Sequence, residues 1–245
     1  MILHIPHSST NTLNYDISNK ERELLRMTDH FTDELFTCSY ASRVVFGLSR
    51  LICDVERFED DEQEEMSKFG MGVCYTTDSE GEKLRDISKI QKKYLIQNYY
   101  RPHHEKLSNE VDSELKSKGT ALVIDCHSFP DRSYYFNKDF NQKRPDICIG
   151  TDSFHTPKKL TQAVKRYFLE KGYDTRVDSP YTGTLVPMKH YKNDLNVHSI
   201  MIEINRKLYM DDEGAKTEHF DTLQDELREL LEKLKRGYDE NDNIW

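Results

Sequence analysis

Residues 121–128 read Ala-Leu-Val-Ile-Asp-Cys-His-Ser, an apolar run that ends in polar residues. A short run of this kind is typical of a buried strand, and we expect one over Ala121–Cys126. His127 follows that strand directly, where the strand would hold its ring rigidly. Ligands of open α/β sheets bind outside the carboxyl ends of the strands. The stretch therefore predicts an α/β sheet with a ligand site beside His127.

Short apolar runs and longer amphipathic segments alternate along the rest of the chain. This alternation favours an α/β sheet flanked by helices, and no linker divides the 245 residues, so we expect a single domain over residues 1–245. The predicted strands are Met1–Ile5, Arg43–Asp54, Ala121–Cys126, Ile147–Gly150, Asp174–Val177 and Ser199–Ile204. The predicted helices are Lys20–Ser39, Ile87–Lys118, Thr156–Lys171 and Ala215–Arg236.

Composition narrows the class of function. The formal net charge of -9 disfavours a nucleic-acid binder that works by neutralising phosphates. The 5 cysteines form no CxxC pair, which argues against a disulfide framework or a cysteine zinc site and favours buried, free thiols. We see neither a signal peptide nor an apolar segment of roughly 18 residues, so we expect a soluble, cytoplasmic protein with a small-molecule partner and no membrane contact. The oligomeric state stays open.

Polar residues follow four of the predicted strands. They are Pro6-His7-Ser8-Ser9, Glu56-Arg57, His127-Ser128 and Asn205-Arg206. Because strand ends meet at the edge of a sheet, we expect these residues to form one shared site.

Two histidines in these clusters are candidate metal ligands. Zinc prefers imidazole and carboxylate ligands where thiolates are absent, and His7 and His127 both stand at strand ends. The alternative is a pair of capping or core histidines bonded to the backbone. Asp125 lies on the same side of the strand as His127 and has the position to orient that imidazole.

The third ligand of a catalytic zinc site is open at this point. Such a site usually takes three protein ligands, and the candidates are Asp29, Asp33, Asp54 and Glu56. In the predicted helix Lys20–Ser39, Asp29 and Asp33 share one face. The block Glu59–Glu65 is expected to be a solvated acidic loop.

Glu203 is a candidate general base because it interrupts an apolar strand, where a lone carboxylate is costly to bury. The alternative for Glu203 is a salt bridge to Arg206 or Arg57. Both arginines are in turn candidates for binding a substrate carboxylate, for which the guanidinium fork is suited, or else are surface or salt-bridge residues.

Two further segments are ambiguous. Residues 180–184 contain Gly183 and suit a close backbone approach to substrate, or form an ordinary turn. Residues 99–104 interrupt a helical pattern at Pro102, so His103 and His104 either contact substrate or mark a helix boundary.

Five stretches, taken in order, resemble the N-formylglutamate amidohydrolase (N-formylglutamate deformylase) family. They are residues 5–9, 28–35, 100–104, 125–128 and 202–209. The resemblance implies a three-layer fold, a mixed sheet with helices on both faces, as in zinc exopeptidases and phosphorylase/hydrolase-like proteins and in zinc-dependent cell-wall amidases.

The resemblance also implies roles for particular residues. His7, Asp29 and His127 would hold zinc, or another divalent metal, and Glu203 would be the base. The metal would lower the pKa of a bound water toward about 7. Arg57, His104, Gly183 and Arg206 are our candidates for contact with the substrate, by default N-formyl-L-glutamate, which would give formate and glutamate.

Two positions depart from the family pattern. Members tend to read Asp-x-Asn-Arg where this chain has Asp54-Val55-Glu56-Arg57, and many have glycine in place of Ser9. Glu56 would be an extra metal ligand or would repel a dicarboxylate substrate. The alternatives to a deformylase are a peptidoglycan or acyl-peptide amidase with the same metal chemistry, and a metal-free binding protein on the same fold.

Overall fold

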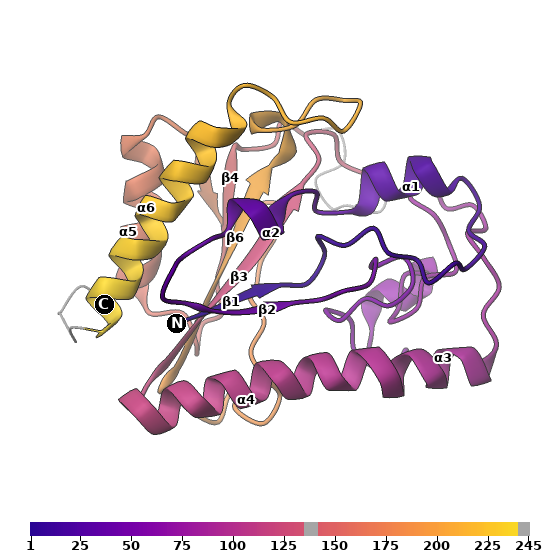
Figure 1. Ribbon diagram of the computed structural model, residues 1–245, viewed down its shortest axis with the longest axis horizontal. Helices are drawn as coiled ribbons and strands as arrows, with labels where there is room; N and C mark the ends of the chain where they lie inside the picture. Colours follow the sequence, from indigo (N-terminus) through magenta and orange to yellow (C-terminus); the bar gives the residue numbers. More distant parts are fainter. Residues whose placement is uncertain (135–141, 240–245) are drawn as a thin grey trace.

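A six-stranded mixed sheet forms the centre of the computed structural model, which describes residues 1–134 and 142–239 (Figure 1). Its strand order is β2-β1-β3-β6-β4-β5. Neighbouring strands among β2, β1, β3 and β6 are parallel, whereas β4 runs antiparallel to β6 and parallel to β5. The bounds are β1 Ile2–Ile5, β2 Ser42–Val45, β3 Ala121–Phe129, β4 Ile147–Gly150, β5 Thr175–Val177 and β6 Val197–Asn205.

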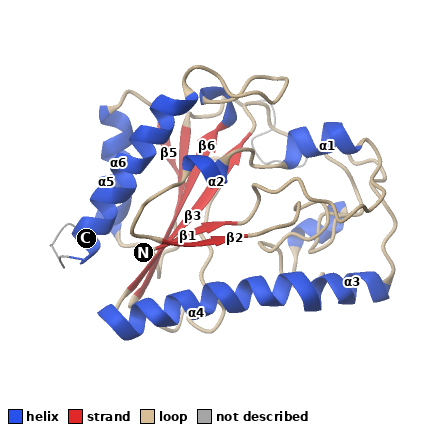
Figure 2. Ribbon diagram, viewed as in Figure 1, coloured by secondary structure: helices blue, strands red, loops and turns tan. Residues whose placement is uncertain are grey.

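Helices cover both faces of this sheet, which confirms the expected mixed three-layer α/β architecture (Figure 2). Helices α2, α5 and α6 lie on one face, and α4 lies on the other. The bounds are α1 Lys20–Met27, α2 Thr32–Leu35, α3 Lys89–Leu95, α4 Arg101–Lys118, α5 Lys158–Glu170 and α6 Phe220–Asp239.

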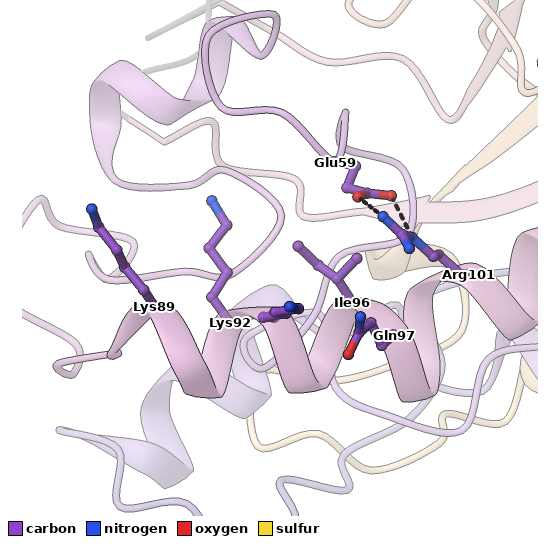
Figure 3. Close-up of a pocket in the computed structure, with 7 residues that line it drawn as sticks. Glu59, Lys89, Lys92, Ile96, Gln97 and Arg101 are labelled. Atoms are coloured by element: carbon purple, nitrogen blue, oxygen red, sulfur yellow. Dashed lines mark hydrogen bonds and ion pairs between the residues drawn. The ribbon is translucent and has the colours of Figure 1, made fainter.

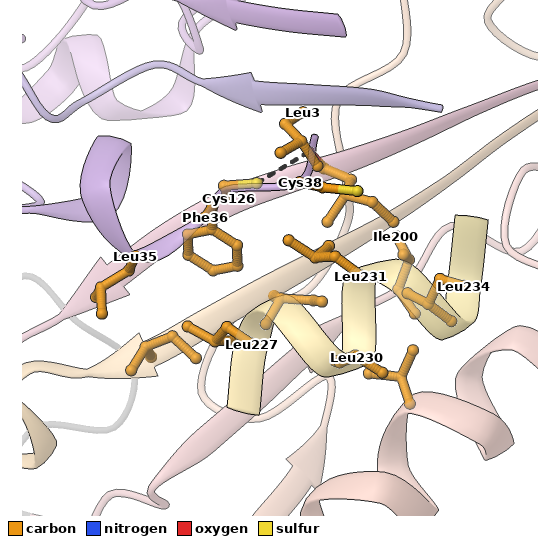
Figure 4. Close-up of a cluster of buried hydrophobic side chains, with 14 of the residues drawn as sticks. Leu3, Leu35, Phe36, Cys38, Cys126, Ile200, Leu227, Leu230, Leu231 and Leu234 are labelled. Atoms are coloured by element: carbon orange, nitrogen blue, oxygen red, sulfur yellow. Dashed lines mark hydrogen bonds between the residues drawn. The ribbon is translucent and has the colours of Figure 1, made fainter. Parts of the chain in front are cut away.

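The main core lies between the sheet and α6, as Figure 4 shows. Leucines on α6 recur at helical spacing, so they form one apolar stripe that packs on Leu3, Cys126 and Ile200 of the sheet. These leucines are Leu227, Leu230, Leu231 and Leu234, all buried. Full burial of one such side chain stabilises the fold by roughly 1.5–3 kcal/mol. All five cysteines are buried and free, as the sequence predicts.

The predicted strand Arg43–Asp54 is wrong beyond Val45. Residues 46–54 form turns, in which the Ser49 carbonyl accepts hydrogen bonds from the amides of Ile52 and Cys53. The apolar residues of this stretch pack into a separate core cluster beneath the loops, which is why the run resembles a strand.

The predicted helix Lys20–Ser39 is also wrong, because it is two helices separated by residues 28–31. Thr28 is extended and Phe31 has a φ of 63°, so the helical hydrogen bonds are interrupted between α1 and α2. Asp29 lies in the break. It therefore does not share a helical face with Asp33.

The predicted helix Ile87–Lys118 corresponds to α3 and α4, and residues 99–104, for which a helix boundary is one of two alternatives, contain the start of α4 at Arg101. A π-turn over Ile96–Tyr100 joins α3 to α4, and Pro102 stands in the first turn of α4. Proline is tolerated there because its missing N–H leaves no regular helical bond broken. Among the described residues, no helix is long and apolar enough to cross a membrane.

Candidate metal and active site

A cavity of about 390 Å³ opens at the carboxyl ends of β1, β3 and β6. His7, Asp29, His127 and Glu203 all line it, so the structure brings together the residues that the sequence indicated as metal ligands and base. They come from four separate segments of the chain.

Each of these side chains has a clear local reason for its position. His7 follows β1, and its carbonyl accepts a hydrogen bond of 3.0 Å from the amide of Asp29, so the break between α1 and α2 is held against β1. His127 and Glu203 are register partners on the neighbouring parallel strands β3 and β6. Because neighbours in register point to the same face, the two side chains share the cavity wall. His127 lies inside β3, which extends to Phe129 rather than ending at Cys126.

The two histidine rings present the same nitrogens to the same kinds of partner. The Nε2 atom of His7 lies 2.8 Å from Asp54 Oδ1, and the Nε2 atom of His127 lies 3.1 Å from Asp125 Oδ1. The Nδ1 atoms of both rings face Asp29 Oδ2, at 3.7 Å for His7 and 3.1 Å for His127. A carboxylate on the far ring nitrogen is the usual support of a metal-binding histidine.

Charge is concentrated around this pair of rings. Burial alone would raise the pKa of Asp54, but Arg50 and His7 hold it well below the usual range of a carboxyl. Burial would likewise lower the pKa of His127, yet Glu56 and Asp125 raise it well above that of an ordinary histidine. The site therefore favours positive charge between its carboxylates.

Glu203 differs from the other carboxylates of the site. It is 8% exposed, and its Oε2 atom is buried with no hydrogen-bond partner in residues 1–134 and 142–239. Burial raises the pKa of Glu203 to about 7, and the nearby Asp29 and Glu56 add to the effect while His127 opposes it. The alternative salt bridge to Arg206 or Arg57 is not found in the described part of the chain. A carboxyl with such a pKa is suited to general acid–base chemistry.

Glu56 reaches the cavity on a turn rather than from a strand end. Asp54 Oδ1 accepts a hydrogen bond from the Glu56 amide at 2.9 Å, which fixes the turn. The side chain brings Oε2 to 3.1 Å from His127 Nε2. Glu56, His7 and His127 offer ligand atoms that all lie within 4.8 Å of one another.

Arg206 and Arg57, two arginines of the cavity, differ in how many hydrogen bonds they donate. Arg206 donates to Ser128 Oγ at 3.2 Å, to the Arg26 carbonyl at 2.5 Å and to Asp29 Oδ1 at 3.3 Å. Arg57 lines the cavity and donates from Nε to the Met71 carbonyl at 3.3 Å. No hydrogen bond of its two terminal nitrogens is found within the described ranges.

Two expected substrate contacts lie elsewhere. His104 is bonded through Nε2 to the Val55 carbonyl at 2.8 Å and is absent from the described lining of the cavity. Gly183 has a φ of 89° and is absent from the described lining of the cavity, which does include its neighbours Pro180, Tyr181 and Thr182. Asp33 lies on α2, outside this set of residues.

Sequence reasoning missed Arg50 and Tyr75, which also line the cavity. Both bind the same carboxylate oxygen, Asp54 Oδ2, at 2.9 Å from Arg50 Nη2 and 2.7 Å from Tyr75 Oη. The only local signal for Arg50 is its spacing of four residues from Asp54. Nothing in the sequence connects Tyr75 with them.

A second hollow lies on the surface of α3, with a volume of about 230 Å³ (Figure 3). Lysines and Arg101 line it, and its acidic residue Glu59 is paired with Arg101 at 3.0 Å. Its described lining contains no histidine. The two histidines His7 and His127 and the carboxylate of Glu203 line the strand-end cavity instead.

Comparison of the sequence with known proteins identifies the family of this chain. The family model described as N-formylglutamate amidohydrolase matches residues 1–210. A Pseudomonas putida protein named N-formylglutamate deformylase is 27% identical over 205 residues, which cover 79% of this chain and 74% of that protein.

Two solved structures share the fold. The crystal structure of N-formylglutamate amidohydrolase from Ralstonia eutropha JMP134 matches with a TM-score of 0.82 and 23% identity, over 96% of this chain and 94% of that one. A gene product from Agrobacterium tumefaciens matches with a TM-score of 0.64 and 18% identity, over 96% and 91% of the two chains. With the family model covering the strands, the cavity and all four of its central residues, the chain belongs to the N-formylglutamate amidohydrolase family.

Proposed function

We propose that this protein is a metal-dependent amidohydrolase that cleaves the amide bond of a small acidic N-acyl amino acid, with N-formyl-L-glutamate as the first substrate to test. One observation carries the proposal. Two buried histidines, each with Nε2 on a carboxylate, turn Nδ1 toward Asp29, and the unpartnered carboxyl of Glu203 lines the same cavity.

The residues present fit a metal ion. His7 Nδ1 is buried without a hydrogen-bond partner in the described chain, although it faces Asp29 Oδ2. A nitrogen lone pair that faces a carboxylate is unfavourable unless a proton or a cation lies between them. We assign His7, Asp29 and His127 as the ligands, and two nitrogens with one carboxylate suit zinc or another divalent transition metal. Bound there, the ion would polarise the substrate carbonyl and lower the pKa of water toward about 7.

Asp29 is preferred over Glu56 as the third ligand because of the ring orientation. Asp29 Oδ2 faces the Nδ1 atoms of both histidines, whereas Glu56 lies on the Nε2 side of His127, where Asp125 also lies. A metal on Nδ1 leaves each Nε2–H free to donate to its carboxylate, which matches the observed pairs.

The chain's own groups then account for the reaction. Glu203 accepts a proton from the water that attacks the acyl carbon, and its pKa of about 7 lets it hold that proton and return it. The proton passes to the leaving nitrogen as the C–N bond breaks, so one water and one amide give a carboxylic acid and an amine. The terminal nitrogens of Arg57 bind the substrate carboxylate. Arg206 holds Asp29 and Ser128 in place.

The relative named N-formylglutamate deformylase supports formylglutamate as the substrate. The test is formate release by the purified, zinc-loaded protein from N-formyl-L-glutamate, with N-acetyl-L-glutamate and a muramoyl peptide as comparison substrates. We expect turnover of the formyl compound that is lost on chelation and restored by zinc. Preferred cleavage of the muramoyl peptide would support the amidase alternative, and no turnover of any substrate with no bound zinc would support the metal-free binding protein.

A further inference from the structure

A second cluster of possible ligands lies behind the ring of His127, deeper in the sheet. His4, Glu56 and Asp125 offer ligand atoms that all lie within 4.8 Å of one another. His4 is fully buried on β1, and Asp125 is 1% exposed on the neighbouring strand β3, where the two residues are register partners. Glu56 closes the cluster from the cavity side.

The possible ligand atoms of these side chains point at one another, and His4 Nδ1 is hydrogen-bonded to Asp125 Oδ1. Asp125 Oδ1 lies 2.8 Å from His4 Nδ1, and Glu56 Oε1 lies 3.6 Å from the same nitrogen. Glu56 Oε1 is buried and has no hydrogen-bond partner among residues 1–134 and 142–239. The opposite side of each group is already held, because Asp125 Oδ2 accepts from the Leu185 amide at 2.9 Å and His4 Nε2 lies 2.9 Å from His103 Nε2. Such outer contacts fix ligands in place.

The carboxylates of this cluster have no lysine or arginine partner among the described residues. Within the described chain, every ion-pair contact of Glu56 and Asp125 goes to a histidine, either His4 or His127, and none goes to a lysine or an arginine. The carboxylates of Asp125, which is buried, and of Glu56, which is partly exposed, are therefore without a permanently charged partner in the described chain. A carboxylate without a compensating charge is unfavourable in a buried position.

We propose that His4, Glu56 and Asp125 form a second divalent-cation site, separate from the one assigned to His7, Asp29 and His127. One imidazole and two carboxylates suit a transition metal such as Zn²⁺ or Mn²⁺, with water completing its coordination. The ion reaches the site past Glu56, which lines the cavity. It neutralises the two carboxylates and fixes Asp125, the residue that orients His127. This inference rests on the proposed function in one respect, because the first metal site is assigned there.

The test counts Zn²⁺ ions bound by the intact chain. Metal-free protein is titrated with Zn²⁺ in a calorimeter, and the bound metal is measured by elemental analysis after desalting. We expect two ions for the wild type and one for Glu56→Gln, which keeps the shape of a partly exposed side chain and removes only its charge. His4→Gln should also bind one ion, and Asp29→Asn should keep the second ion while losing the first.

The matched control is Glu65→Gln, which makes the same chemical change at another carboxylate of the cavity and should bind two ions. A single ion in the wild type that Asp29→Asn abolishes and Glu56→Gln retains overturns the second site and leaves the proposed function intact. Two ions in Glu56→Gln also overturn it, because the second ion then lies elsewhere. A single ion lost only in Glu56→Gln overturns both the second site and the choice of Asp29. No bound ion in any protein overturns both proposals.

Discussion

Two buried glutamates, Glu23 on α1 and Glu203 on β6, have opposite surroundings. Glu23 is fully buried, and its two oxygens accept hydrogen bonds from the Ser79 amide at 2.8 Å, from Ser79 Oγ at 3.0 Å and from Arg22 Nε at 3.0 Å. Glu203 is almost as buried, yet its Oε2 has no partner within the described chain. A satisfied buried carboxylate ties two segments together, whereas an unsatisfied one destabilises the fold and points to a role in chemistry.

The largest effect that this comparison predicts is on catalysis. Glu203→Gln keeps the size of the side chain but cannot accept a proton, so we expect kcat/KM for formate release to fall by about 10²–10⁴-fold. Zinc content should not change, because Glu203 is not among the assigned ligands. A variant with full turnover and normal zinc content would show that Glu203 is not the base.

In the metal-free protein, Glu203 should also make the free energy of unfolding depend on pH. Burial raises the pKa of Glu203 from 4.5 to about 7, so the folded state binds more protons than the unfolded state between these values. The contribution of Glu203 to the free energy of unfolding is therefore lost as the pH rises through this window, by about 3 kcal/mol in total. Glu203→Gln removes this loss.

Urea unfolding of both proteins at a series of pH values measures this effect. The stability of Glu203→Gln relative to the wild type should increase between about pH 4.5 and pH 7.5 and stay constant on either side. A difference that does not vary with pH would mean that Glu203 titrates normally.

Local pattern was enough to predict the central part of this site. Strands β1, β3 and β6 are short apolar runs, so the sequence predicted His7 and His127 at strand ends and identified Glu203 as a carboxylate that interrupts a strand. Parallel central strands are buried on both faces, which makes such runs easy to recognise.

The supporting residues could not be predicted in the same way. Asp54 and Arg50 lie on turns. The apolar neighbours of these two residues fill a second core cluster, so this stretch is as rich in apolar residues as a strand and is predicted to be one. Tyr75 joins them only through the tertiary fold. The break that positions Asp29 depends on Phe31, whose positive φ is not a preference of phenylalanine and is imposed by packing.

Asp54 offers a smaller effect than Glu203, because it supports a ligand and does not react. Asp54→Asn weakens the hydrogen bond that orients His7, so we expect the affinity for the first zinc ion to fall by about 10–100-fold. Competition with a chelator of known affinity measures the change. The control is Asp112→Asn, which alters a surface carboxylate that lies 2.9 Å from His190 and should leave zinc affinity unchanged. Equal losses in both variants would contradict a specific role for Asp54.

The smallest predicted effect concerns Glu23, the hydrogen-bonded glutamate of the pair. Glu23→Gln removes the charge that binds Ser79 and Arg22, so we expect the free energy of unfolding at pH 7 to fall by about 1–3 kcal/mol. Activity should be unchanged below the unfolding transition, because the Glu23 contacts lie outside the described lining of the cavity. The exposed neighbour Glu21 is the control, and Glu21→Gln should change stability by no more than about 0.5 kcal/mol. A loss of kcat/KM in Glu23→Gln without a loss of stability would reverse the comparison, because a fully hydrogen-bonded carboxylate would then be the one that the reaction needs.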